Sequence, residues 1–233
     1  LILKELAMKK AAIFGDSIMR GMFWNEKLAK HKLWQNPYPA RIAAESGIEI
    51  ENHSFIGSTI KRGRAIFDKM RNKGLHCDLL LLEYGGNDSD YDWPQIAAAP
   101  KEEHFPKTML SVFEHAYGEL ISLGRSLGMQ PVIMTLPPID AQKYFNWFSR
   151  KLDKQALMQW LVDIGIIYRH QEAYSLACAR LALQYSCPLI DLRSAFLLRK
   201  DLDTLIGIDG LHPTPAGYEV IWQQIAAFFL KFK

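Results

Sequence analysis

Two apolar runs in this chain do not alternate with polar residues. Residues 79–82 read Leu-Leu-Leu-Leu and residues 132–134 read Val-Ile-Met, and each run has the length of a strand. A strand with one solvated face alternates apolar and polar side chains, whereas a strand buried on both faces does not. These runs therefore predict a parallel sheet that helices cover on both faces.

Helix-length segments separate the strand candidates. The five strand candidates are residues 11–14, 48–55, 78–84, 131–136 and 188–192. The clearest helix is predicted over residues 106–127, and a last helix is expected to begin with Thr214 as N-cap and Pro215 at its first position. Strands that alternate with helices predict a three-layer α/β/α sandwich, with a single domain over residues 8–233 and its site at the carboxyl ends of the strands.

The stretch 137–182 between the fourth and fifth strand candidates is too long for a simple crossover. It is expected to contain two helices, and residues 138–182 are a candidate helical cap inserted in the domain. Its aromatic residues fall on more than one helix face, so a cover over the pocket, a homo-oligomer contact and ordinary packing all stay open. Residues 1–7 precede a Met-Lys-Lys that resembles a natural start, and are expected to be expression-derived or a frayed N-terminal extension.

Composition excludes several classes of protein. Lys and Arg number 28 and Asp and Glu 25, so the net charge is +3 and is spread along the chain. So small and dispersed a positive charge does not indicate a nucleic-acid partner or an anionic membrane surface. The three cysteines are not spaced as a disulfide framework would require. The first apolar run is too short for a signal peptide or a membrane span. A cytoplasmic location is expected.

A serine and a histidine stand where a hydrolase would need them. Ser17 follows the first strand candidate directly, at a turn where its hydroxyl would project from the sheet edge. Asp209 precedes His212 by three residues, so the carboxylate could fix the tautomer of a general base. Taken singly, each group could equally be part of a capping turn or a helix entry.

Two further positions could donate hydrogen bonds to an oxyanion. Asn87 follows two glycines after the third strand candidate, and Gly57 follows the second, where its N–H would be unobstructed. In each case a strand-ending turn is the plain alternative. A doubly wound topology would nevertheless bring these positions, Ser17 and His212 to the same edge of the sheet.

These residues together resemble the four motif blocks of the SGNH hydrolase superfamily, the GDSL-type esterases, lipases and acylhydrolases. The blocks read Gly-Asp-Ser at 15–17, Gly57, Gly-Gly-Asn-Asp at 85–88 and Asp-Gly-Leu-His at 209–212. Ile18 stands where the family name has leucine, a common variation. The resemblance implies a flavodoxin-like sheet of five parallel strands in the order 2-1-3-4-5. It also implies Ser17 as nucleophile, His212 as base, Asp209 as its orienting carboxylate, and an oxyanion hole formed by the Ser17 N–H, the Gly57 N–H and Asn87.

No metal or cofactor is expected. The histidines lack metal-ligand spacing, and no Gly-rich phosphate loop occurs. Residues that follow the oxyanion asparagine, separate the triad members or belong to the insertion are candidates for substrate contact: Asp88, Tyr91, Trp93, Leu211, Tyr144 and Trp147.

The expected function is a serine esterase that acts on a small-molecule ester through an acyl-serine intermediate. A short acyl group is expected, and an O-acetylated carbohydrate is the first substrate hypothesis. A lysophospholipase, a thioesterase and an acyltransferase would use the same residues. The non-enzymatic alternative is a module of this fold that binds a ligand without turning it over.

Overall fold

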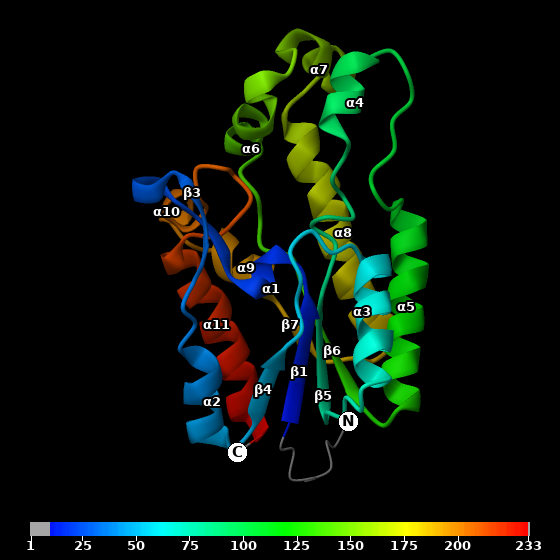
Figure 1. Ribbon diagram of the computed structural model, residues 1–233, viewed down its shortest axis with the longest axis vertical. Helices are drawn as coiled ribbons and strands as arrows, with labels where there is room; N and C mark the ends of the chain where they lie inside the picture. The colour runs from blue at the N-terminus through cyan, green and yellow to red at the C-terminus, as the bar shows by residue number, and fades with distance from the viewer. Residues whose placement is uncertain (1–9, 233) are drawn as a thin grey trace.

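A parallel sheet of five strands forms the centre of the protein, as seen in a computed structural model that describes residues 10–232 (Figure 1). The expectation for residues 1–7 lies outside the described part. The strand order is β4-β1-β5-β6-β7. The strands are β1 (Lys10–Gly15), β4 (Glu49–Asn52), β5 (Leu79–Glu83), β6 (Gln130–Met134) and β7 (Leu189–Ile190). Because these are the first to fifth strands of the sheet along the chain, the expected order 2-1-3-4-5 is confirmed.

Each inner strand sends its side chains to both faces of the sheet. Alternate residues of β5 belong to two different hydrophobic clusters, with Leu79 and Leu81 in one and Leu80 and Leu82 in the other. All four leucines are fully buried. Burial on both faces explains why this run has no polar residue.

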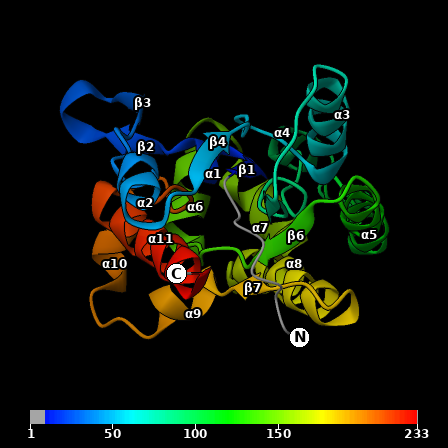
Figure 2. The same cartoon turned by 90° about the horizontal axis from the view of Figure 1, so that it is seen from below.

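Helices cover the two faces and complete a three-layer α/β/α sandwich (Figure 2). One layer contains α2 (Tyr38–Ser46), α9 (Leu192–Leu197), α10 (Leu202–Leu205) and α11 (Pro215–Phe229). The other contains α3 (Ile60–Arg71), α5 (Leu110–Ser126) and α8 (Gly165–Gln184). The Thr214 side chain accepts a hydrogen bond from the Gly217 N–H, which confirms the predicted N-cap of α11.

A third hydrophobic cluster lies beyond the carboxyl ends of the strands. The helices that form it are drawn at the top of Figure 1. It joins α4 (Trp93–Ala98) to the insertion helices α6 (Ala141–Phe148) and α7 (Lys154–Leu161). Together with α8, the insertion contains three helices, whereas two were expected. Its last helix, α8, packs on β6 and α5 and is part of the sandwich itself.

An antiparallel hairpin follows the first strand and was not predicted. The single turn α1 (Ser17–Arg20) leads into β2 (Met22–Asn25), and β3 (Lys30–Leu33) returns beside it. The 3₁₀ turn η1 (Glu26–Leu28) connects the two strands, and two further 3₁₀ turns are η2 (Ser149–Lys151) and η3 (Leu230–Phe232). The hairpin lies between β1 and α2, where a simple alternation of strands and helices predicts no further strand.

The prediction for residues 106–127 placed the start of that helix too early. The helix begins at Leu110, because the preceding backbone is bound to the loop after β5. The Lys107 N–H donates to the Asp90 carbonyl at 2.8 Å and the Thr108 N–H to the Asp88 carbonyl at 3.1 Å. Among residues 10–232, no helix has both the length and the apolar character needed to cross a membrane.

Candidate active site

Ser17 lies at the turn between β1 and α1. Asp16 is the N-cap of α1, and its Oδ1 accepts the Ile18 N–H at 2.8 Å. This bond satisfies one of the free donors of the short helix and fixes the turn. Ser17 is consequently held at the carboxyl edge of the sheet, with 6% of its surface exposed.

The loop before α11 brings the base to this serine. His212 Nε2 lies 3.1 Å from Ser17 Oγ, although the two residues are 195 positions apart in the sequence. On the other side of the ring, His212 Nδ1 lies 2.8 Å from Asp209 Oδ2. Because a carboxylate only accepts, Nδ1 carries the proton and Nε2 is free to accept one from the serine.

Backbone groups fix the Asp209 carboxylate. Its Oδ1 accepts the N–H groups of Leu211 and His212, each at 3.0 Å. Burial by itself raises the pKa of Asp209, but the hydrogen bonds and the charge of His212, with these backbone donors, outweigh it and hold the pKa well below its usual range. Asp209 is therefore ionised beside the histidine at neutral pH.

Asn87 lies across the site from this pair. Its Nδ2 donates one hydrogen to Asp16 Oδ2 at 2.8 Å. The second hydrogen on Nδ2 takes no part in this bond. Gly57 is exposed in the loop after β4, with a φ of +71°. The Phe55 N–H, two residues earlier, donates to the Gly15 carbonyl at 3.1 Å, so this loop is tied to the end of β1.

Two buried carboxyl groups lie beneath the serine. Glu83, at the end of β5, is 1% exposed, as is Asp16. Burial, followed by the negative charge of Asp16, raises the pKa of Glu83 well above its usual range. Burial also raises the pKa of Asp16, against the opposing bonds from Ile18 and Asn87. Both carboxyl groups thus have a raised pKa, and that of Glu83 is the more strongly raised.

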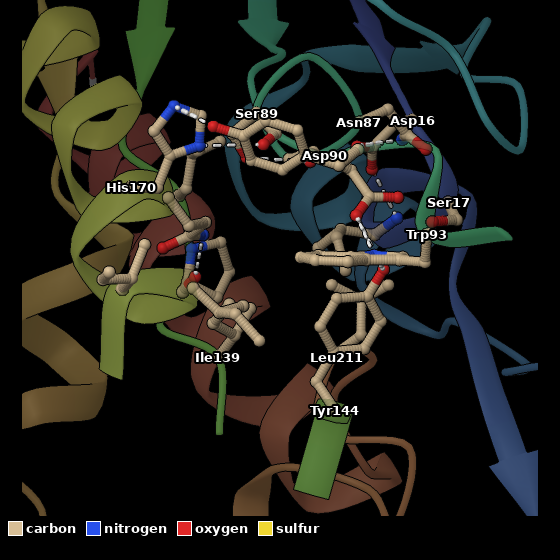
Figure 3. Close-up of a pocket in the computed structure, with 18 of the residues that line it drawn as sticks. Asp16, Ser17, Asn87, Ser89, Asp90, Trp93, Ile139, Tyr144, His170 and Leu211 are labelled. Carbon is tan, nitrogen blue, oxygen red and sulfur yellow. Dashed lines mark hydrogen bonds between the residues drawn. The ribbon is translucent and has the colours of Figure 1, made fainter. Parts of the chain in front are cut away.

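A pocket opens beside Ser17, between the sheet edge and the insertion helices (Figure 3). It has a cavity volume of about 50 Å³. Four of the residues predicted to contact substrate line it: Tyr91, Trp93, Tyr144 and Leu211. Asp90 Oδ1 accepts from Trp93 Nε1 at 2.9 Å and from the Tyr144 hydroxyl at 2.8 Å, so the loop after β5 and α6 are joined at the pocket wall.

The chain matches the profile of the GDSL-like Lipase/Acylhydrolase family over residues 13–220. It belongs to this family. The match spans all the motif blocks, and the protein is an ester-hydrolysing serine hydrolase of the SGNH type. A search of curated proteins finds no match.

Solved structures share the fold of this GDSL-like hydrolase at low sequence identity. A lipase/acylhydrolase from Enterococcus faecalis is 19% identical, with a TM-score of 0.65 and 95% of each chain covered. An alpha/beta hydrolase enzyme from the metagenome of Lake Arreo, Spain, is 20% identical, with a TM-score of 0.66 and coverage of 98% of this chain and 99% of that one. An acetylxylan esterase from Geobacillus stearothermophilus is 18% identical, with a TM-score of 0.60 and coverage of 95% and 94%.

Two residues proposed to contact substrate lie elsewhere in this hydrolase. Asp88 is fully buried outside the pocket lining, and both its carboxylate oxygens accept the Ile60 N–H, at 3.0 and 3.1 Å. Burial raises the pKa of Asp88 to about 6. Trp147 packs edge-on against Trp24 of the hairpin, with ring centroids 4.6 Å apart. The prediction for Asp88 is therefore wrong, because its side chain is bound to the start of α3. Trp147 is half-buried and lies outside the pocket lining, and its contact with substrate stays a prediction.

His31 lies at the site although no sequence motif pointed to it. Its Nε2 lies 3.2 Å from Asp209 Oδ2, the same oxygen that His212 Nδ1 approaches. The possible ligand atoms of His31, Asp209 and His212 lie within 4.8 Å of one another. The two ring nitrogens converge on one carboxylate oxygen at hydrogen-bond distances, which is the geometry of two N–H donors sharing an acceptor. His31 lies in a Lys-His-Lys segment far from every motif block, so no local pattern identifies it.

Proposed function

We propose that this hydrolase cleaves esters of short carboxylic acids through an acyl intermediate on Ser17. The observation that carries the proposal is the continuous path of hydrogen bonds from Asp209 through His212 to Ser17, at the mouth of a small pocket. A serine hydroxyl is a weak nucleophile until an oriented base takes its proton, and this path supplies that base.

The first step forms a bond between Ser17 Oγ and the ester carbonyl carbon. The Ser17 proton moves to His212 Nε2, and the carbonyl oxygen acquires negative charge. The second amide hydrogen of Asn87 and the N–H groups of Ser17 and Gly57 are the proposed donors to this oxyanion. His212 then returns the proton to the departing alkoxide, and a water molecule repeats the sequence to release the acid.

The size of the pocket favours a short acyl group, and its lining bears on the rest of the substrate. The cavity of about 50 Å³ has room for only a few water molecules, since one water needs about 10 to 15 Å³ on this measure. Apolar side chains of α7 and α8, among them Leu161 and Ile167, line it. Aromatic rings and carboxylates at the wall, such as Trp93 and Asp90, also suit an alcohol part with hydroxyl groups. An acetylated carbohydrate is therefore our substrate hypothesis, and one solved structure of this fold comes from an acetylxylan esterase.

A fluorophosphonate probe tests the nucleophile. The native protein should gain one label, and Ser17→Ala should gain none, because an unactivated hydroxyl reacts slowly at neutral pH. Equal labelling of both proteins would exclude Ser17 as the nucleophile. The exposed serine variant Ser126→Ala is the matched control and should label like the native protein.

A substrate series tests the acyl group and the alcohol. Aryl acetate, butyrate and octanoate, acetylated xylo-oligosaccharides and a lysophospholipid should be assayed side by side. We expect kcat/KM to fall steeply beyond the butyrate, and acetylated sugars to exceed the lysophospholipid. The reverse order would exclude the short-acyl proposal and leave the nucleophile assignment intact.

A further inference from the structure

The triad carboxylate has four hydrogen-bonding neighbours and not three. Asp209 Oδ1 accepts two backbone N–H groups, and Oδ2 faces two imidazole rings, His212 Nδ1 at 2.8 Å and His31 Nε2 at 3.2 Å. The Asp209 side chain is 2% exposed, whereas the His31 side chain is 33% exposed. His31 therefore lies between Oδ2 and the solvent.

The His31 ring is held by aromatic rings from two different elements. Trp24 faces it across the hairpin, in register with it, and the ring centroids are 5.1 Å apart in an edge-to-face arrangement. Trp147 of α6 packs against Trp24 and lies 6.1 Å from the His31 ring. The Arg150 guanidinium covers the Trp147 ring at 3.6 Å. The hairpin and the insertion thus meet at the side of the triad and fix the direction of the His31 Nε2–H.

We propose that His31 is a positioning residue for the triad. It donates its Nε2–H to Asp209 Oδ2, excludes water from that oxygen, and keeps the carboxylate plane aligned with His212 Nδ1. Because the ionised carboxylate only accepts, His31 must carry a proton on Nε2 in this role. Without the ring, mobile water would take the place of this donor at Oδ2 and would hold the carboxylate plane less firmly toward His212. This inference rests on the proposed role of Asp209 and His212 and extends it to a residue on the hairpin.

Two substitutions at one position separate the hydrogen bond from the bulk of the ring. His31→Ala removes the donor and should lower kcat by about three- to tenfold with KM within about twofold, since a bond to a charged group is lost but water can partly replace it at this exposed position. His31→Gln places an amide N–H near the position of Nε2 and should restore most of the lost kcat. Lys32→Ala, on the same strand with its side chain exposed, is the control and should act like the native protein.

A spectroscopic measurement makes the test independent of turnover. The downfield proton resonance of His212 Nδ1–H reports the strength of its bond to Asp209. It should move upfield or broaden by exchange in His31→Ala and return in His31→Gln, with melting temperatures of all variants near the native value. A structural role for His31 would lower the melting temperature and leave kcat of the folded fraction unchanged.

The outcomes separate this inference from the proposed function. If Ser17→Ala is inactive while His31→Ala keeps its native kcat and its native Nδ1–H resonance, the positioning role is wrong and the triad stands. If His31→Gln is as impaired as His31→Ala and still folded, a donated N–H is not what His31 supplies, and the proposal is also overturned. If Ser17→Ala stays active, the proposed nucleophile is wrong, and the resonance alone decides whether His31 holds Asp209.

Discussion

Asn87 and Asp16 are joined by a 2.8 Å hydrogen bond, with the asparagine Nδ2 as donor and the aspartate Oδ2 as acceptor. Asp16 also caps α1 through its other oxygen, so one carboxylate sets both the helix that begins at Ser17 and the direction of the Asn87 amide. The nucleophile and the proposed oxyanion donor therefore share a common support. A substitution of Asp16 would therefore affect both groups.

Replacing Asn87 tests its role as an oxyanion donor. We expect Asn87→Ala to lower kcat by about 10²- to 10³-fold with KM almost unchanged, because the amide binds the carbonyl oxygen mainly once that oxygen is charged. Asn87→Asp should be at least as damaging, since it adds a carboxylate beside Asp16 and Glu83. Steady-state kinetics and melting temperatures of both variants decide the question. A destabilised Asn87→Ala that keeps nearly full kcat would mean that the asparagine only holds the turn.

His212 and Asp209 should contribute unequally to kcat. His212→Ala should lower kcat by about 10⁵- to 10⁶-fold and Asp209→Ala by about 10²- to 10⁴-fold, because the carboxylate only orients the ring, and backbone groups or water can partly do so. The double variant Ser17→Ala with His212→Ala should lose no more than either single variant. A greater loss in a folded Asp209→Ala would point to another residue as the base.

The buried Glu83 should make stability fall as pH rises. Burial and the charge of Asp16 raise the pKa of Glu83, so the folded protein keeps a proton that the unfolded chain releases above its ordinary glutamate pKa. Between those two pKa values, native stability should fall relative to Glu83→Gln by up to about 1.4 kcal/mol per pH unit. Urea unfolding between about pH 4 and 8 measures this difference, with the exposed Glu45→Gln as control. Parallel stability curves for native protein and Glu83→Gln would contradict the assigned protonation.

Gly210, between the two triad residues of the last loop, should not accept a side chain. Its φ is +70°, and a Cβ would overlap the backbone of Asp140 and Tyr144 at the start of α6. We expect Gly210→Ala to cost about 2 to 4 kcal/mol in the free energy of unfolding, from backbone strain and overlap together.

Gly128 is the matched control for this substitution. It has a similar φ of +79° and nothing within 4 Å of the added Cβ, so Gly128→Ala should pay the strain alone, about 1 kcal/mol. Urea unfolding and kcat of both variants check the comparison. Equal costs at the two positions would mean that α6 moves aside freely from the triad loop.

Local signals made much of this structure predictable. The apolar strand runs, the Thr214 cap and the Pro215 start depend on neighbouring residues alone, and the sheet order followed from the family resemblance. The motif blocks likewise identified Ser17, His212, Asp209 and Asn87, which the structure brings to one edge of the sheet.

The β2–β3 hairpin could not be predicted because distant packing stabilises it. Its connection has no Asn-Gly or Asp-Gly turn, and its strands have four residues each. The residue after it, Trp34, stacks on Tyr218 of α11 with centroids 5.4 Å apart, and Trp24 packs on Trp147. These contacts join segments more than a hundred residues apart, so no local pattern reveals the hairpin or its His31.

Asp88 shows a different limit of sequence reasoning. It follows the proposed oxyanion donor directly, yet its carboxylate binds the backbone at the start of α3. Successive side chains in a turn can point in opposite directions, so adjacency along the chain does not place a group in the pocket. Two residues of α6 likewise differ in direction, since Tyr144 lines the pocket while Trp147 packs against the hairpin.

The 195-residue separation between Ser17 and His212 has a consequence for the folding of the chain. Their 3.1 Å contact requires that β1, the neighbouring strands and α11 have all docked, and contacts of such high sequence separation form slowly. Catalytic turnover is then a reporter of complete tertiary assembly, and not of local structure. In a refolding experiment, activity would return later than the helical circular dichroism signal. The length of this delay would measure how slowly the sheet and its two helical layers assemble.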